Sequence, residues 1–224
     1  MKYNNIKQGT FISRPNRFIA NILIDGKEEV CHVKNTGRCK ELLVPGASVL
    51  VEVLDNLQRK TKYDLISVYK GDRLVNMDSQ APNKLFKEWA KNHFTNATLV
   101  KPEVKYKNSR FDFYIEEDEK KIFVEVKGVT LENNNVVMFP DAPTQRGVKH
   151  IYELCDSVKN GYKAYVFFVV QMSDVKYFTP NAVTHPEFAN ALKFAKENGV
   201  GVYCVDCDVA EDELKIKNYV EVVL

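Results

Sequence analysis

The sequence predicts an α/β protein with a β-barrel, because the spacing of its apolar residues changes near Asp78. Residues 1–80 contain short runs in which apolar and polar residues alternate, with turn residues between them, which is typical of β-strands. Residues 81–224 alternate helix-like and strand-like patterns, as mixed α/β domains do. We therefore expect a first domain over residues 1–80 and a second over residues 81–224.

The first part is predicted to form a small closed barrel. Its five expected strands are 9–13, 17–24, 28–33, 48–53 and 62–69. An OB-fold is one barrel of this size, and its strands and loops commonly hold nucleic acid. The charge agrees with this expectation, since residues 1–80 carry 13 Lys and Arg against 9 Asp and Glu, a net +4. The remainder carries 19 against 21, a net −2, so the barrel is the better candidate for contacts with a phosphate backbone.

The second part is predicted to begin with a helix over 83–93 that buries Leu85, Phe86, Trp89 and Ala90. A strand over 103–106 and a hairpin of two strands over 109–115 and 121–127 should follow. Thr144 is placed to cap a helix that runs to about residue 160 and buries Val148, Ile151, Cys155 and Val158. The expected order then continues with a strand over 162–171, a helix over 186–198 and a strand over 200–205.

The hairpin carries the most informative polar residues. A tight turn at Asp118-Glu119 makes the numbers of paired residues sum to 237, which places Asp112 opposite Glu125 and Arg110 opposite Lys127. Strict alternation further predicts that Phe111, Phe113 and Ile115 share one face while Asp112 and Tyr114 point to the other. Asp112, Glu125 and Lys127 should therefore share a face.

Two carboxylates opposed across a hairpin would have β-carbons about 5 Å apart and would repel each other. A divalent cation resolves that conflict, and Mg²⁺ or Mn²⁺ suits two carboxylates completed by water and phosphate oxygens. The expected metal ligands are Asp112 and Glu125, and Lys127 would neutralise charge on a phosphorus centre. Phosphodiester hydrolysis by Asp112, Glu125 and Lys127 is the chemistry predicted. The alternative is an ordinary half-exposed hairpin with one polar face.

Three longer stretches, residues 35–46, 124–131 and 139–150, are similar to the sugar fermentation stimulation protein family, SfsA, and the resemblance spans nearly the whole chain. Asp112 followed by Glu125-x-Lys127 resembles the metal site of the PD-(D/E)XK nuclease superfamily, with Phe111 where a proline is usual. The resemblance implies DNA binding, an N-terminal OB-fold and a C-terminal PD-(D/E)XK nuclease-like domain.

DNA contacts are expected on two segments. In the barrel, the candidate residues are Arg14, Arg17, Lys34, Arg38 and Lys40, around a loop whose amides face solvent. At the start of the helix after the hairpin, the candidates are Thr144, Arg146 and Lys149, where free amides favour an anion. The alternatives are a solvated basic loop and a Thr144 that only caps its helix.

Several other polar residues have weaker claims to the site. Glu88, Glu103 and Asp141 are further candidate carboxylates, and His150 is expected on the helix surface. Cys39 lies in the loop and is expected to be partly exposed. Cys204 and Cys207 form a lone Cys-x-x-Cys on a late strand, where buried thiols are favoured over a metal site.

Composition predicts a globular protein of the cytoplasm: 224 residues, 45% hydrophobic and 28% charged, with no signal-peptide pattern and no apolar run that would span a membrane. Three functions follow as hypotheses: a metal-dependent DNA nuclease, a DNA-binding regulator of sugar metabolism with a catalytically silent nuclease-like domain, and an enzyme unrelated to nucleic acid. A homodimer with paired sites would cut both strands of a duplex, but one sequence identifies no interface.

Overall fold

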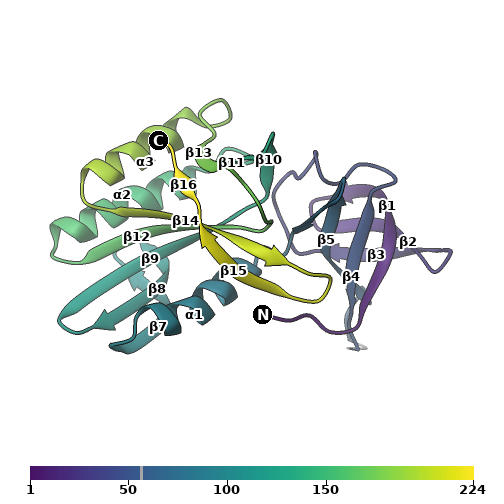
Figure 1. The fold of residues 1–224 in the computed structure, drawn as a ribbon, viewed down its shortest axis with the longest axis horizontal. Helices are drawn as coiled ribbons and strands as arrows, with labels where there is room; N and C mark the ends of the chain where they lie inside the picture. Colours follow the sequence, from purple (N-terminus) through teal and green to yellow (C-terminus); the bar gives the residue numbers. More distant parts are fainter. Residues whose placement is uncertain (56–57) are drawn as a thin grey trace.

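The computed structural model describes residues 1–55 and 58–224, and it places a β-barrel beside a sheet flanked by helices (Figure 1). The barrel strands are β1 (Ile6–Asn16), β2 (Ile19–Ile24), β3 (Lys27–Val33), β4 (Ser48–Val53) and β5 (Tyr63–Lys70). They pair in the order β3-β2-β1-β4-β5, and parallel pairing of β3 with β5 closes the barrel. β6 (Arg73–Asn76) pairs with β5 in antiparallel orientation. The predicted five-stranded barrel is therefore confirmed.

The barrel forms because its strands alternate and its turns carry the residues that tight turns need. Asp25 and Gly26 link β2 to β3, and both have positive φ, of 51° and 76°. Two successive positive φ angles are typical of the hairpin turn whose twist matches that of paired strands. Along β2, Ala20, Ile22 and Ile24 point inward and are at most 2% exposed. These inward residues form the barrel core.

The second part is a mixed α/β domain built on a six-stranded sheet, as predicted. Its strands are β7 (Ala97–Tyr106), β8 (Ser109–Glu117), β9 (Lys120–Val129), β12 (Lys163–Val170), β14 (Gly201–Val209) and β15 (Leu214–Tyr219). The spatial order is β15-β14-β12-β9-β8-β7, with β12 parallel to both β9 and β14. A smaller sheet joins β10 (Leu131–Asn133), β11 (Val136–Phe139), β13 (Tyr177–Pro180) and β16 (Glu221–Val222).

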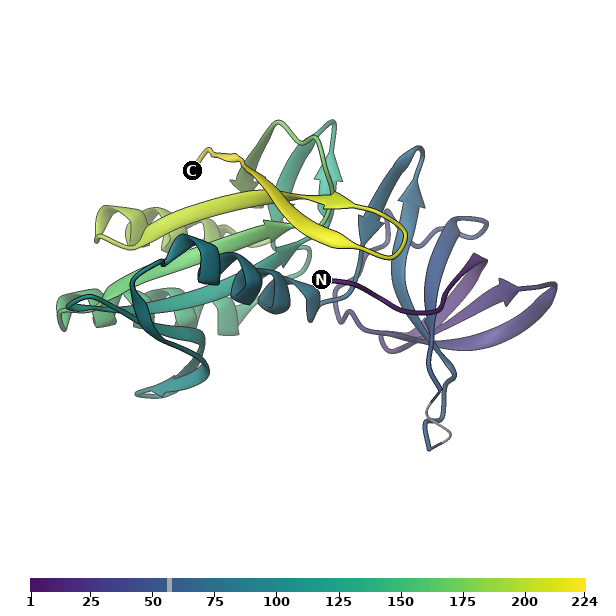
Figure 2. The same ribbon diagram turned by 60° about the horizontal axis from the view of Figure 1, so that its bottom comes forward.

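Helices cover both faces of the large sheet. α1 (Ala81–His93) packs on one face through Phe86, which contacts Phe113 and Phe167. α2 (Gln145–Lys159) and α3 (Pro186–Glu197) lie together on the opposite face (Figure 2). All three predicted helices are confirmed to within two residues at each end. The central strands of the sheet are therefore buried on both sides, while the edge strands β7 and β15 remain largely exposed.

Other predictions about elements need correction. The strand expected over 103–106 begins at Ala97, because most of β7 is an exposed edge strand without a clear apolar face. β6, β10, β11, β13, β15 and β16 were not predicted. Cys39 was expected to be partly exposed, but it is 1% exposed, and burial raises the pKa of its thiol to about 12. Cys204 and Cys207 are buried free thiols, as predicted.

Polar contacts join the barrel to the α/β part. The Gln171 side chain donates through Nε2 to Asn76 Oδ1 at 2.7 Å and to the Asp78 carbonyl at 2.9 Å. Lys70 Nζ lies 2.6 Å from Glu132 Oε2, and this pair also crosses between the two parts. These contacts orient the barrel loops toward one edge of the large sheet.

Among the helices in the described part of the chain, none has the length and apolar character that a membrane-spanning helix needs.

Candidate active site

The β8–β9 hairpin has the predicted register, but its ladder ends at Phe113–Val124, three pairs before the predicted pair of Arg110 with Lys127. Its ladder runs from Glu117–Lys120 to Phe113–Val124, and every pair sums to 237. Beyond Phe113, the Val126 amide donates to the Asp112 side chain, with Oδ2 at 2.8 Å, in place of a strand partner. The expected ladder pairs of Asp112 with Glu125 and of Arg110 with Lys127 do not form within the described ladder. Arg110 instead lies beside β7, where it pairs with Lys105.

The face expected for Phe111 is wrong, and the reason lies in the neighbouring strand. Phe111 contacts Phe123 and the His150 ring on the α2 side, whereas Phe113 contacts Phe86 on the α1 side. Glu103, which lies between the β7 partners of Phe113 and Phe111, has φ +53°, a conformation that interrupts a regular strand. The alternation of β8 breaks at Asp112, directly opposite this residue.

Asp112 is held at this turn by two donors. Besides the Val126 amide on Oδ2, the Asn83 side-chain amide donates to Asp112 Oδ1 at 3.1 Å from the start of α1. Burial, together with the nearby charge of Glu125, raises the Asp112 pKa above its usual range. Burial is the larger cause, and the repulsion between the two carboxylates adds to it; a bound cation would relieve that repulsion.

Glu125 is buried in the centre of the sheet at 2% exposure. Its Oε1 accepts from Lys127 Nζ and from His150 Nδ1, the latter at 2.6 Å. Its Oε2 is buried and has no hydrogen-bond partner among the described residues. Burial alone would raise the Glu125 pKa, but the Lys127 ammonium and the His150 hydrogen bond outweigh it and lower the pKa below its usual value. Glu125 is thus an ionised carboxylate with one unused oxygen.

His150 has an assigned proton because of its second neighbour. Arg146 Nε donates to His150 Nε2 at 3.3 Å. A guanidinium nitrogen only donates, so Nε2 accepts and the ring proton lies on Nδ1, where it is donated to Glu125. His150 was expected on the helix surface, but it is buried, with 5% of its surface exposed. The sequence gives little sign of this role, because His150 is one of several polar residues on α2.

The residues present fit a hard divalent cation such as Mg²⁺ or Mn²⁺. A buried carboxylate oxygen without a partner is costly unless something outside the chain contacts it. Over the described residues, no group of three or more His, Cys, Asp or Glu side chains is arranged around a common point. Asp112 and Glu125 are nonetheless sufficient for a cation that takes one or two carboxylates and completes its shell with water and phosphate oxygens.

The predicted DNA-contact residues of the barrel divide into two groups. Arg17, Arg38 and Lys40 are exposed and available to a ligand. Arg14 points into the loop, where its guanidinium donates to the carbonyls of four residues: Arg17, Asn35, Gly37 and Arg38. Lys34 forms an ion pair with the fully buried Asp78 at 2.8 Å, and its side chain is 12% exposed. Both residues were expected to be available for contacts with DNA. Instead, Arg14 and Lys34 use their charged groups in contacts that hold the loop together.

The candidates on α2 also differ among themselves. Thr144 caps the helix by accepting from the Gly147 amide at 3.0 Å. Arg146 and Lys149 are exposed, and Lys149 Nζ also donates to the Asn108 carbonyl at 3.0 Å. Arg146 thus reaches both solvent and His150, which in turn bonds to Glu125.

A basic groove beside the site was missed by the sequence reasoning. It has a volume of about 700 Å³ and is lined by Lys105, Asn108, Ser109, Arg110, Gln145, Arg146, Lys149 and His150. Four of these residues are Lys or Arg, and none of the described lining residues is acidic. The Ser109 hydroxyl is buried without a described partner. Lys105 and Arg110 are brought together by the register of β7 with β8. The sequence could have indicated the groove only through the hairpin that joins these two strands.

The three weaker carboxylate candidates lie in other contacts. Glu88 Oε2 pairs with the amino group of Met1 at 3.0 Å. Glu103 is exposed and lies 3.6 Å from Arg110. Asp141 Oδ2 accepts from the Cys39 amide at 2.9 Å and so anchors the barrel loop to the α/β part. None of these three is bonded to Asp112 or Glu125 in the described contacts.

Comparison with known proteins identifies both parts of the chain. Residues 12–77 match the family model described as the SfsA N-terminal OB domain, and residues 80–213 match the sugar fermentation stimulation protein RE domain. Sugar fermentation stimulation protein homologs from Clostridium beijerinckii and Ruminiclostridium cellulolyticum are each 63% identical, with 100% and 99% of both chains covered, respectively. A solved structure, described as Pyrococcus furiosus SfsA in complex with Ca²⁺, is 26% identical with a TM-score of 0.90, covering 100% of this chain and 98% of that one.

Proposed function

The chain belongs to the sugar fermentation stimulation protein family, and from this membership and the geometry of the site we propose that it is a cytoplasmic DNA-binding protein with a metal-dependent nuclease site. In this proposal, residues 1–80 contact DNA and residues 81–224 hydrolyse a phosphodiester bond. Asp112, Glu125 and Lys127 are the catalytic residues.

The observation that carries the proposal is the unused oxygen of Glu125. Lys127 and His150 occupy Oε1, while Oε2 is buried without a described partner. Asp112 is close enough for the charge of Glu125 to raise its pKa. A buried and a half-buried carboxylate in this state match the ligand set of a hard cation. The Ca²⁺ named in the solved relative is another hard cation that prefers oxygen ligands, which supports this choice.

Each residue of the proposed site has a separate role. Asp112 and Glu125 would hold Mg²⁺ or Mn²⁺, which supplies a polarised water and neutralises charge on the phosphate when bound. Lys127, 17% exposed at its side chain, faces the same carboxylate and adds a positive charge where charge develops on phosphorus. Asn83 and the Val126 amide keep Asp112 in place. His150 keeps Glu125 in place and leaves Oε2 for the cation.

DNA is supported as the substrate by the charges beside the site. The basic groove lies directly next to His150 and carries Lys105, Arg110, Arg146 and Lys149. On the barrel, Arg17, Arg38 and Lys40 are exposed. Exposed cations in clusters of this kind bind phosphate backbones without reading sequence. The buried Ser109 hydroxyl offers a hydrogen bond within the groove.

Cleavage of labelled single-stranded and duplex DNA with Mg²⁺ or Mn²⁺ tests the proposal. Asp112→Asn and Glu125→Gln should each lower the rate by at least about a hundredfold, since each removes a metal ligand. Asp118→Asn is the matched control, because it makes the same change at the exposed turn of the same hairpin and should leave the rate unchanged. Melting curves establish that all three variants fold.

Three outcomes would overturn the nuclease assignment. Cleavage that persists in Asp112→Asn and Glu125→Gln would belong to another site or to a contaminant. DNA binding without cleavage by the parent protein under any metal would favour the regulator with a silent nuclease-like domain. Absence of DNA binding at low salt would remove both readings.

A further inference from the structure

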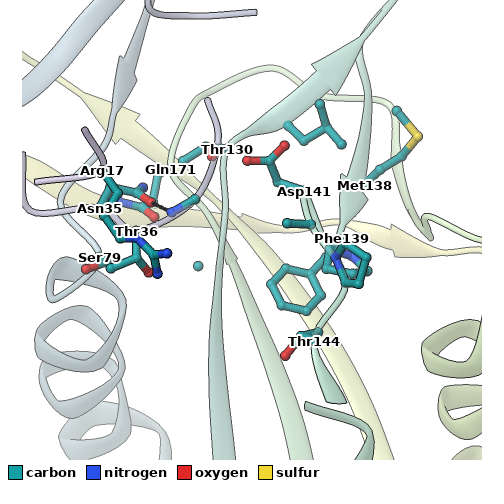
Figure 3. A pocket seen from close by; sticks show the side chains of 16 residues that line it. Arg17, Asn35, Thr36, Ser79, Thr130, Met138, Phe139, Asp141, Thr144 and Gln171 are labelled. Atoms are coloured by element: carbon teal, nitrogen blue, oxygen red, sulfur yellow. Dashed lines mark hydrogen bonds between the residues drawn. The ribbon is translucent and has the colours of Figure 1, made fainter. Parts of the chain in front are cut away.

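A second cleft, distinct from the basic groove, lies between the barrel and the α/β part. It has a volume of about 430 Å³, within the range of roughly 300–1,000 Å³ that is typical of ligand pockets. Figure 3 shows its two walls facing each other, with Arg17, Asn35, Thr36 and Ser79 on one side and Phe139, Asp141 and Thr144 on the other. The cleft exists only because both parts of the chain contribute a wall.

The two walls differ in chemistry. The α/β wall combines an apolar surface with polar groups: Leu131, Met138 and Phe139, all of them half-buried, form the apolar surface, and Asp141 and Thr144 lie beside it. The barrel wall presents the exposed Arg17 and Thr36. A flat ligand with apolar faces and hydrogen-bonding edges fits between such walls. A nucleobase has this form, and bases stack on aromatic rings and on guanidinium groups alike.

Both walls are held in place without a ligand. Asn35 donates through Nδ2 to the Met77 carbonyl at 2.9 Å and accepts from the Gly37 amide at 2.7 Å. Asp141 accepts from the Cys39 amide and so ties the loop of the barrel wall to the opposite wall. A cleft that is formed in advance binds with less loss of conformational entropy.

The cleft begins next to the catalytic residues. Gly128, which follows Lys127 on β9, lines it, and so does Thr144, which precedes Arg146 on α2. A β-carbon at position 128 would lie 2.6 Å from Gln171 Oε1 and 2.7 Å from Pro82 Cγ, so glycine is what lets β9 pass this close to Gln171, which also lines the cleft. A strand with its scissile phosphate at Lys127 would thus have a neighbouring nucleotide at the cleft.

We infer that this cleft holds the base of one unpaired nucleotide, so that the preferred DNA is single-stranded or locally unpaired next to the cleaved bond. The inference rests on the proposed nuclease function and specifies its substrate. A base in a duplex is stacked on both faces and paired at its edge, and it enters such a cleft only after leaving the stack. A single strand has no such barrier.

Filling the cleft tests the inference. Thr36→Phe places a ring in the cleft from an exposed loop position and leaves Asp112, Glu125 and Lys127 unchanged. Binding is measured by fluorescence anisotropy with a labelled single strand and with the duplex of the same sequence, in EDTA so that nothing is cut. Loss of one stacked base should weaken single-strand binding about tenfold and leave duplex binding unchanged.

Thr95→Phe is the matched control, because it makes the same exposed substitution just beyond the far end of α1. The helix starts beside the cleft at Ala81, and its 13 residues span about 20 Å. Met138→Ala provides a second variant that shortens the apolar wall and should weaken single-strand binding in the same direction. Melting curves confirm that the variants fold.

Unchanged single-strand binding in both Thr36→Phe and Met138→Ala would overturn the inference, as would an equal loss for the duplex. A 2-aminopurine base in the single strand adds a direct signal: its fluorescence should change on binding to the parent and much less with Thr36→Phe. Failure of the nuclease function is seen separately, as absence of cleavage by the parent. The selective effect on single-strand binding does not depend on that result.

Discussion

His150 Nδ1 lies 2.6 Å from Glu125 Oε1, and this contact determines which oxygen of Glu125 is left for a ligand. Arg146 occupies the other ring nitrogen, so the imidazole donates to Glu125 and holds it in one orientation. Residues that orient a metal ligand in this way commonly have a large effect on the affinity for the metal.

Replacement of His150 should therefore weaken metal binding. His150→Ala is expected to lower the affinity for Mn²⁺ or Ca²⁺ by roughly 10–100-fold, because Glu125 loses the donor that orients it. His150→Asn retains a side-chain donor and should recover part of the affinity. Calorimetric titration of the metal gives this readout independently of cleavage. His93→Ala removes an exposed imidazole at the end of α1 and should bind as the parent does; an equal affinity in His150→Ala would contradict the role.

The basic groove should determine the salt dependence of DNA binding. Each phosphate contact contributes about 0.9 to the slope of log affinity against log salt for duplex DNA. The double variant Lys105→Gln with Arg110→Gln is expected to reduce that slope by about 1 to 2. Lys193→Gln with Lys196→Gln removes two exposed charges from α3 and is the control. The same slope in both double variants would show that the groove does not contact DNA.

Arg14 should be required for the stability of the barrel loop and not for DNA affinity. Its guanidinium donates to four backbone carbonyls, and a lysine ammonium does not reproduce this planar set of donors. Arg14→Lys is expected to cost about 1–3 kcal/mol of unfolding free energy. Thermal melting and limited proteolysis of the loop measure the effect. Arg38→Lys, an exposed change in the same loop, should leave stability unchanged, and similar melting of the two variants would refute the assignment.

The contact between Glu132 and Lys70 should make the junction sensitive to acid. Burial alone would raise the Glu132 pKa, but the hydrogen bond from Lys70, the Asn135 amide and Arg73 lower it. The folded protein therefore binds this proton less tightly than the unfolded chain. The stabilisation is complete above the unfolded pKa of about 4.3 and is lost as the pH falls through the folded value.

Glu132→Gln should consequently lower the melting temperature at pH 7, and its difference from the parent should shrink as the pH falls below about 4. Glu119→Gln, at the exposed hairpin turn, should melt as the parent at each pH. A difference between Glu132→Gln and the parent that stays constant into acid would show that the carboxylate charge is not what stabilises the junction.

The hairpin shows how far local sequence reasoning reaches. Alternation and a tight turn were sufficient to predict the register of β8 with β9, because those signals lie within the paired segments. They did not predict that Phe111 and Phe113 face opposite sides, because the break in alternation lies opposite Glu103 on β7, an irregular residue outside the hairpin. The pattern therefore predicted which residues lie near Asp112, but not the break in alternation that orients its side chain.

Contacts between segments that are far apart in the sequence could not be predicted. His150 was identified only as a polar helix residue, since its contact with Glu125 depends on how α2 packs against the sheet. Lys34 looked like a free cation in a basic loop, and its partner Asp78 lies 44 residues further along the chain. The cleft at Thr36 and Phe139 requires both parts of the molecule. Such features follow from packing between distant segments, which no window of sequence contains.

The bond from Gln171 to Asn76 also has a consequence during synthesis. The two residues are 95 positions apart, so the barrel strands leave the ribosome well before Gln171 exists. At about 5–20 residues per second, the delay is roughly 5 to 20 s. Throughout it, Asn76 Oδ1 and the Asp78 carbonyl are without the amide that later joins them, and water takes its place. These two bonds between the barrel and the α/β part can therefore form only after residue 171 has been synthesised.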